Sequence, residues 1–191
     1  MAAKLPTLRI IEPNLRGPSG HYAEFVRAVS NRSQGVLGNI DIAASAQALE
    51  HCDLGAHTTV RGAFHGHKWR EEVSELRSAL RSSDPFLILT ARPATALVLE
   101  TLARGVNATD PKALQRARLY FHWCSRGTSE RLMSRMAHHV RAQAMAIAPT
   151  PTIADFLRNA GWKRVEQVPY PILAPATIPA APPQCRMLLM A

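Results

Sequence analysis

The regular alternation of short apolar runs with helical patterns is the feature that most restricts how this chain can fold. Runs rich in Leu, Ile and Val are separated by longer segments in which apolar residues recur every three or four positions. Such alternation is typical of parallel strands joined by crossover helices, because a parallel strand needs a long return connection. We predict an α/β, Rossmann-like, doubly wound fold with a mostly parallel sheet of six or seven strands flanked by helices. The expected strands are 8–11, 36–42, 58–61, 86–90, 119–123, 146–148 and 165–168.

Capping signals mark the ends of several expected helices. Ser19 is a candidate N-cap for the first helix. Pro93 and Gly105 bracket another helix, and Thr150 and Gly161 bracket the last one. The spacing of apolar residues predicts which side chains face the core. They are Tyr22, Phe25, Val26 and Val29; Trp69, Val73, Leu76 and Leu80; Leu97, Val98 and Leu102; and Leu132, Met133, Met136 and Val140.

Composition restricts the class of protein and its location. With 191 residues, of which 47% are hydrophobic, the chain suits one domain or one domain plus a fragment. No run approaches the roughly 20 apolar residues of a membrane span, and Lys4 interrupts any signal-peptide core. The three cysteines, Cys52, Cys124 and Cys185, are widely spaced and odd in number, which favours a reducing compartment. We expect a cytoplasmic location, with peripheral contact to the inner membrane face as a further option.

The formal net charge of +9 comes from arginines scattered over most of the expected helices rather than from one basic block. We therefore expect no nucleic-acid partner. A basic face suits anionic lipid head groups or a phosphate-bearing ligand, whereas the simpler interpretation is that an arginine-rich composition raises the isoelectric point.

The last part of the chain changes in composition. We assign residues 1–168 to the Rossmann-like domain and 169–184 to an extended linker rich in Pro and Ala. The apolar residues 185–191 are interpreted as the first strand of a second domain. The alternative is that they add an edge strand to the first sheet.

Several motifs, in this order, resemble the N-terminal half of GT-B-fold glycosyltransferases of the family-four type, which act in bacterial polysaccharide and lipopolysaccharide synthesis. The motifs are Glu12-Pro-Asn-Leu-Arg-Gly-Pro-Ser-Gly-His-Tyr, Phe121-His122-Trp123, Ala146-Ile-Ala-Pro-Thr-Pro-Thr-Ile-Ala-Asp-Phe-Leu, Gly161-Trp, Val168-Pro-Tyr-Pro and the strand 187–190. The resemblance implies an acceptor-side domain that helps to transfer a sugar from a nucleotide-sugar donor to a glycan or lipid-linked acceptor, with no metal or other cofactor. The family's donor contacts lie in its second domain, so this chain alone is expected to be inactive.

Two other classes of function stay open at this stage. One is a non-catalytic Rossmann-like binding or interaction module that lacks the donor domain. The other is a nucleic-acid binder, which rests on charge alone and would show salt-dependent binding to oligonucleotides.

The candidate site residues are those that follow the strands, because ligands of doubly wound sheets bind beyond the carboxyl ends of the strands. In the resembling family, a histidine in the position of His122 lies near the transferred sugar, which makes His122 the catalytic candidate; the alternative is a packed, backbone-bonded histidine. The substrate-binding candidates are Glu12, Gly17, Gly20, His21, Arg92 and Thr150. Glu12 is expected either to contact an acceptor hydroxyl or to cap its loop, and Arg92 to pair with a phosphate.

Metal-capable side chains also occur around residues 51–67, including His57 and His65. Their spacing lacks the close ligand pairs of zinc sites, so we expect a solvated loop there and no metal.

Overall fold

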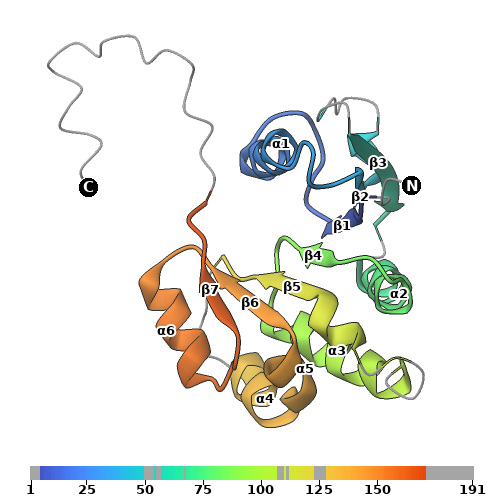
Figure 1. Ribbon diagram of the computed structural model, residues 1–191. Coiled ribbons are helices and arrows are strands. Elements are labelled where there is room, and N and C mark those ends of the chain that lie inside the picture. The colour runs from blue at the N-terminus through green and yellow to red at the C-terminus, as the bar shows by residue number, and fades with distance from the viewer. Residues whose placement is uncertain are drawn as a thin grey trace, which may run out of the picture.

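The computed structural model describes residues 5–49, 54, 57–66, 68–106, 110, 112–122 and 128–170. Its centre is a seven-stranded sheet in the order β3-β2-β1-β4-β5-β6-β7, in which every neighbouring pair is parallel (Figure 1). The predicted α/β, doubly wound fold is thereby confirmed. The strands are β1 Thr7–Glu12, β2 Asn39–Ser45, β3 Thr58–Phe64, β4 Phe86–Ile88, β5 Ala117–Tyr120, β6 Met145–Ala148 and β7 Val165–Gln167.

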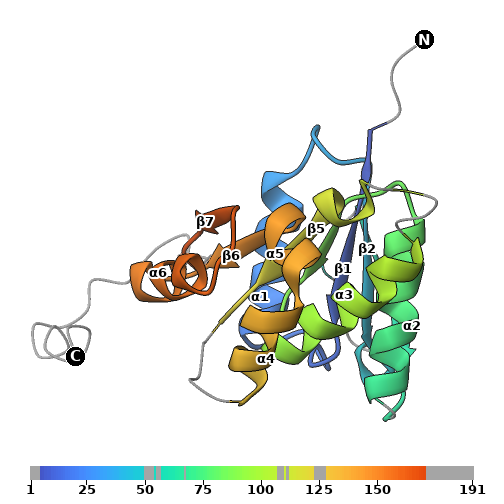
Figure 2. The ribbon, with the colours of Figure 1, turned by 90° about the horizontal axis from the view of Figure 1, so that it is seen from below.

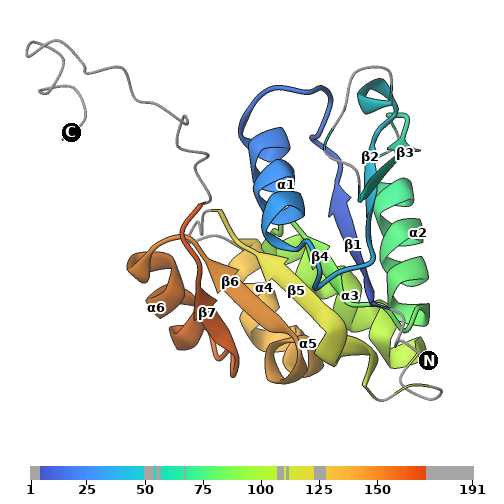
Figure 3. The same cartoon turned by 45° about the horizontal axis from the view of Figure 1, so that its top comes forward.

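Helices cover both faces of the sheet. Helix α1 lies on one face, and α2 to α5 lie on the other (Figures 2 and 3). The helices are α1 His21–Arg32, α2 Lys68–Arg81, α3 Pro93–Val106, α4 Thr128–Met136, α5 His138–Gln143 and α6 Pro151–Asn159, with 3-10 turns at Ala46–Ala48 and Ala113–Arg116. Helices α1, α2, α3 and α6 each connect one strand to the next, and α4 and α5 together connect β5 to β6, as a parallel sheet requires.

Two hydrophobic cores fill the space between the sheet and its helices. Ile10 belongs to the core under α1, whereas its neighbour Ile11 belongs to the core under α2 and α3. Both are buried because consecutive side chains of a strand point to opposite faces, and both faces of this sheet are covered. This explains why its strands read as continuous apolar runs rather than as alternating patterns.

The strand order reverses between β1 and β4. Strand β1 pairs with β2 on one side through six residues, and with β4 on the other side through three, from Arg9↔Phe86 to Ile11↔Ile88. Connections leave the carboxyl ends of these two strands toward opposite faces of the sheet, which opens a crevice at this edge. Doubly wound proteins bind their ligands in such a crevice.

Two expected strands are shifted in the structure. Residues 36–42 were predicted as one strand, but β2 begins only at Asn39. The amides of Val36 and Leu37 both donate to the Ser33 carbonyl at 2.9 Å, in a turn that Gly35 enters with φ +78°. The other shift is in β5, which ends at Tyr120, so Phe121 and His122 follow the strand rather than lie in it.

Three expectations about the helices were wrong in detail. Helix α1 is capped by Gly20 (φ +92°), not by Ser19. Gly105 lies inside α3 instead of beyond its end. The stretch expected as one helix from residue 128 is broken at Ala137 (φ −88°, ψ +53°) into α4 and α5. Leu132 and Met136, expected to face the core, lie one turn apart on α4 and are 41% and 53% exposed.

The signals around α6 are confirmed. The Thr150 hydroxyl accepts a hydrogen bond from the Ile153 amide at 3.3 Å, and Pro151 occupies the first helical position. Gly161 follows the helix with φ +89°, a conformation that favours glycine.

The expected strand 185–191 and most of the expected linker lie outside the described residues. Within the described ranges, no helix combines the length and the apolar character that crossing a membrane requires.

Candidate functional site

A pocket of about 440 Å³ occupies the crevice where the strand order reverses. Its wall combines apolar and aromatic side chains with one amide, one hydroxyl, one carboxylate and one guanidinium. Such a mixture is typical of small-molecule sites, in which a few polar groups orient a ligand against apolar walls. The lining residues are Ile11, Pro13, Asn14, Tyr22, Trp69, Glu72, Ile88, Thr90 and Arg92.

Glu12 lies behind this wall rather than in it. Its carboxylate accepts hydrogen bonds from the backbone N–H of Asn14 at 2.8 Å and from the Thr90 hydroxyl, and its side chain is fully buried. Burial raises the pKa of Glu12 from 4.5 to about 7, against the two hydrogen bonds that lower it. Glu12 therefore fixes two groups of the pocket wall, one from each side of the crevice, and also caps the loop after β1.

The pocket contains a carboxylate held by two partners. Glu72, on α2, accepts a hydrogen bond from the Thr95 hydroxyl at 2.9 Å and pairs with Arg92 Nη2 at 2.9 Å. Glu72 is only 4% exposed, whereas half of the Arg92 side chain faces solvent. Arg92 thus reaches the site as expected, but its charge is already balanced by a buried carboxylate. An anionic ligand would have to compete with Glu72 for it.

Trp69 stands at the rim of the pocket. The sequence pattern predicts an inward-facing tryptophan, yet 56% of it is exposed. Trp69, Glu72 and Leu76 lie on one face of α2. Of these three side chains, Leu76 packs in the hydrophobic core, Glu72 is buried beside the pocket and Trp69 is exposed. Exposure of so large an apolar ring is costly in water, so the ring is available to stack on a ligand.

Aromatic rings surround His122 beside the pocket. His122 lies 4.9 Å from Tyr120, 5.2 Å from Tyr170, 6.0 Å from Tyr22 and 6.1 Å from His21, measured between ring centroids. Tyr170, which lies in the segment assigned to the linker, packs here and donates a hydrogen bond to the His21 carbonyl at 2.9 Å. Two of the sequence-predicted residues, His21 and His122, are therefore neighbours.

The His122 ring is positioned by the strand next to its own. Its Nε2 donates to the Leu89 carbonyl at 2.8 Å, so the proton of the neutral ring lies on that nitrogen. Burial lowers the pKa of His122, and the charge of His21 lowers it further, against the hydrogen bond to the Leu89 carbonyl. The imidazole is therefore neutral at pH 7, which suits hydrogen bonding to hydroxyls rather than pairing with an anion.

Tyr22 joins the two parts of the site. Its ring lines the pocket and also contacts His21, with centroids 3.8 Å apart. Because Tyr22 is the second residue of α1, the loop from β1 to α1 determines where both rings stand (Figure 3).

The two glycines of this loop differ. Gly20 has φ +92°, which only glycine adopts easily, whereas Gly17 has an ordinary φ. A Cβ added at either residue would meet nothing within 4 Å. Both therefore face open space beside the site.

Thr150 lies at the same edge of the sheet, after β6, with β5 between β6 and β4. Its hydroxyl is engaged in the α6 cap, and its side chain is exposed. The structure therefore gives Thr150 a structural part and does not bring it into the pocket.

Asn14, Glu72 and Thr90 line the pocket but were not among the candidates predicted from the sequence. Asn14 and Thr90 are each two residues beyond a strand, where the rule of strand ends could have found them. Glu72 sits between Trp69 and Leu76 at helical spacing, so its place on the buried face of α2 was also visible in the pattern.

Among the described residues, no group of three His, Cys, Asp or Glu side chains could hold a metal ion. No protein-family model matches the chain, and no curated protein matches its sequence.

Proposed function

We propose that this chain is the acceptor-side domain of a nucleotide-sugar-dependent glycosyltransferase, and that the crevice between β1 and β4 holds the acceptor sugar. The observation that carries the proposal is the pocket of about 440 Å³, whose lining combines an exposed Trp69 ring with polar groups that Glu12 and Thr95 hold in place. A pyranose has an apolar ring face and a rim of hydroxyls. A site that binds a pyranose therefore needs an aromatic or apolar surface for the ring face and polar groups for the hydroxyls.

The polar groups suit sugar hydroxyls. Asn14 offers an amide, Thr90 a hydroxyl and Glu72 a carboxylate, so donors and acceptors are both present. Glu12 holds Asn14 and Thr90 in place, which reduces the entropy lost when a sugar binds.

His122 is the proposed catalytic group. In the reaction, the acceptor hydroxyl oxygen bonds to the anomeric carbon of the donor sugar, the bond from that carbon to the diphosphate oxygen breaks, and the hydroxyl proton passes to the departing diphosphate. A neutral imidazole, oriented by Leu89 and flanked by His21 and Tyr22, suits contact with the sugar near that carbon. The residues that bind the nucleotide-sugar donor would lie in a further domain, as the resemblance to GT-B glycosyltransferases implies.

Binding is tested by NMR on the ¹⁵N-labelled chain, titrated with a panel of mono- and oligosaccharides and with nucleotide sugars. We expect saturable shifts at the amides of Asn14, Tyr22 and Thr90 with at least one sugar. Trp69→Ala should weaken that affinity about tenfold, equivalent to about 1.4 kcal/mol of lost apolar contact.

Met136→Ala serves as the matched control, because Met136 is similarly exposed but lies on α4. No shift with any sugar, or equal losses in the two variants, would contradict the proposal.

A non-catalytic sugar-binding module is the second candidate. It is favoured by the internal partners of Arg92 and His122, which the fold already satisfies with Glu72 and the Leu89 carbonyl. Release of nucleoside diphosphate from a donor panel distinguishes the two. Sugar binding without any release by the full natural polypeptide that contains this chain identifies the module.

A further inference from the structure

A second hollow lies away from the candidate site, on the amino-terminal side of the sheet. Its volume is about 460 Å³, and its lining consists of three arginines and three serines: Arg9, Ser74, Arg77, Ser78, Arg81 and Ser82. Arg9 comes from β1, where its amide donates to the Pro85 carbonyl just before β4. The other five come from α2 and the residue after it.

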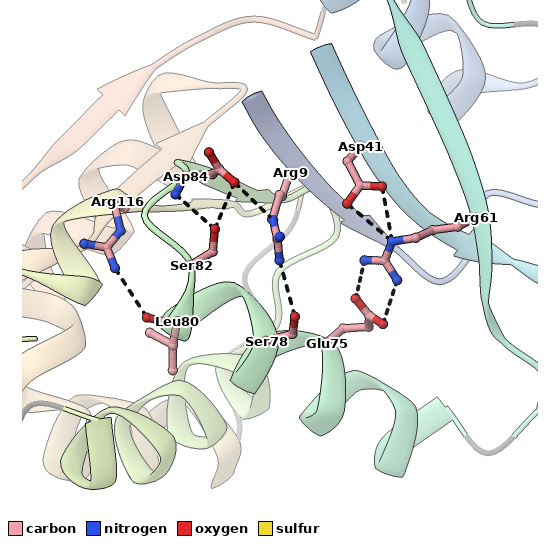
Figure 4. Close-up of polar contacts among 9 residues, drawn as sticks. All are labelled: Arg9, Asp41, Arg61, Glu75, Ser78, Leu80, Ser82, Asp84 and Arg116. Atoms are coloured by element: carbon pink, nitrogen blue, oxygen red, sulfur yellow. Dashed lines mark hydrogen bonds and ion pairs between the residues drawn. The ribbon is translucent and has the colours of Figure 1, made fainter. Parts of the chain in front are cut away.

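Two arginines packed near this hollow are neutralised by carboxylates. Arg61 is held between Asp41 and Glu75, and Arg116 pairs with Asp110 and also donates to the Leu80 carbonyl (Figure 4). In contrast, nothing in the described part of the chain forms a hydrogen bond or ion pair with the side chain of Arg77 or Arg81. Both are exposed.

Arg9 is only partly compensated. Its Nη1 donates to the Ser78 hydroxyl at 3.3 Å, and its Nε lies 3.5 Å from an Asp84 oxygen that also accepts from Ser82 (Figure 4). Arg9 Nε is buried and makes no hydrogen bond within the described residues. With Asp84 counted, the hollow keeps an excess of about two positive charges.

We propose that this hollow binds a phosphate group. Guanidinium groups donate paired N–H bonds that match the oxygens of a phosphate, and serine hydroxyls add further donors around them. A volume of about 460 Å³ leaves room for a diphosphate or for the organic part of a phosphate ester. The inference is independent of the proposed function, because none of these residues lines the crevice between β1 and β4.

The simplest competing explanation is structural. Arg81 is in the last turn of α2, where a cation stabilises the negative end of the helix dipole. That role would affect the free energy of unfolding but would leave phosphate affinity unchanged, so the two explanations are separable.

The test measures binding of inorganic pyrophosphate to the full ¹⁵N-labelled chain at about 0.15 M ionic strength, from the amide shifts of Ser78 and Ser82. R77A/R81A should weaken the affinity at least about tenfold, because a hydrogen bond to a charged group is worth about one decade of affinity or more. R77K/R81K, which keeps the charge but loses the forked donors, should fall between that variant and the wild type.

R131A/R135A is the matched control, since it removes the same charge from exposed positions on α4. It should change the affinity less than about twofold, because exposed charges beyond a Debye length are screened. Equal weakening by the two alanine pairs would show that net charge alone is responsible and would overturn the proposal. So would a changed unfolding midpoint without a changed affinity.

A second experiment, with lipid vesicles, distinguishes a phosphate of a lipid headgroup from a phosphate of a soluble ligand. Sedimentation with phosphatidylglycerol vesicles, compared with phosphatidylcholine vesicles, reports on a lipid headgroup, whereas pyrophosphate reports on a soluble ligand. Loss of either interaction in R77A/R81A supports the site. Absence of saturable binding to both probes, or full retention in R77A/R81A of all the binding that the wild type shows, would refute it.

Discussion

Glu12→Gln is the substitution that most directly tests the electrostatics beneath the candidate site. The Glu12 side chain is fully buried and bonded to Asn14 and Thr90. Its pKa is raised from 4.5 to about 7 because burial disfavours the charged form. Glutamine has nearly the same shape but does not titrate. Comparing the two proteins therefore isolates the proton on this carboxyl.

The sign of the effect follows from proton linkage. Below pH 4.5 Glu12 is protonated in both the folded and the unfolded chain. Between pH 4.5 and 7 the unfolded chain loses this proton and the folded chain keeps it, so stability falls as the pH rises. At 1.36 kcal/mol per pKa unit the full effect is about 3 kcal/mol, reached once the pH exceeds the folded pKa.

Urea unfolding of the wild type and of Glu12→Gln, followed by far-UV circular dichroism between pH 4 and pH 8, measures this difference. The free energy of unfolding of the wild type should decline relative to the variant by about 3 kcal/mol over that range. Glu166→Gln, on the exposed edge strand β7, is the control and should give a nearly flat difference. A flat difference for Glu12→Gln, or one that rises with pH, would refute a buried carboxyl with a raised pKa.

Three further substitutions test local features by the same unfolding assay. Thr150→Ala removes the α6 cap and should reduce the free energy of unfolding by about 1 kcal/mol; no loss would mean that the cap is replaced by water. Tyr120→Phe removes the hydrogen bond from its hydroxyl to the Val168 carbonyl (3.1 Å) and should also reduce stability by about 1 kcal/mol, with an unchanged midpoint as the contrary result. Gly20→Ala places a side chain at φ +92° and should cost about 1 kcal/mol or more, whereas Gly17→Ala, at an ordinary φ, should not; equal effects would contradict the backbone argument.

Much of the fold could be predicted from the sequence because local signals and packing agree in it. The run 86–90 is apolar on both faces since both sides of β4 are covered, and the residues from Thr150 to Gly161 carry every signal of a capped helix. Prediction failed where tertiary geometry decides. The break at Ala137 and the turn around Gly35 come from backbone angles that apolar spacing does not encode.

The candidate site was only partly predictable. From the rule that ligands bind beyond the carboxyl ends of the strands, we predicted that His21, His122 and Arg92 lie at one edge of the sheet. In the structure His21 and His122 are neighbours and Arg92 lines the pocket. The rule could not show that Arg92 is paired with Glu72, because that partner comes from a helix twenty residues earlier in the chain. The outward position of Trp69 was hidden by its regular spacing with Val73 and Leu76.

The reversal of strand order has a consequence for how the molecule opens. The sheet consists of a β1–β3 half and a β4–β7 half that meet at β1 and β4 through three residue pairs, as many as join each neighbouring pair of strands within the second half. A ligand in the crevice would contact Asn14, which follows β1, and Thr90, which follows β4, and would so link the two halves of the sheet. Its binding free energy would then oppose separation of the halves. Slower amide hydrogen exchange in β4 would report an occupied site without any assay of catalysis.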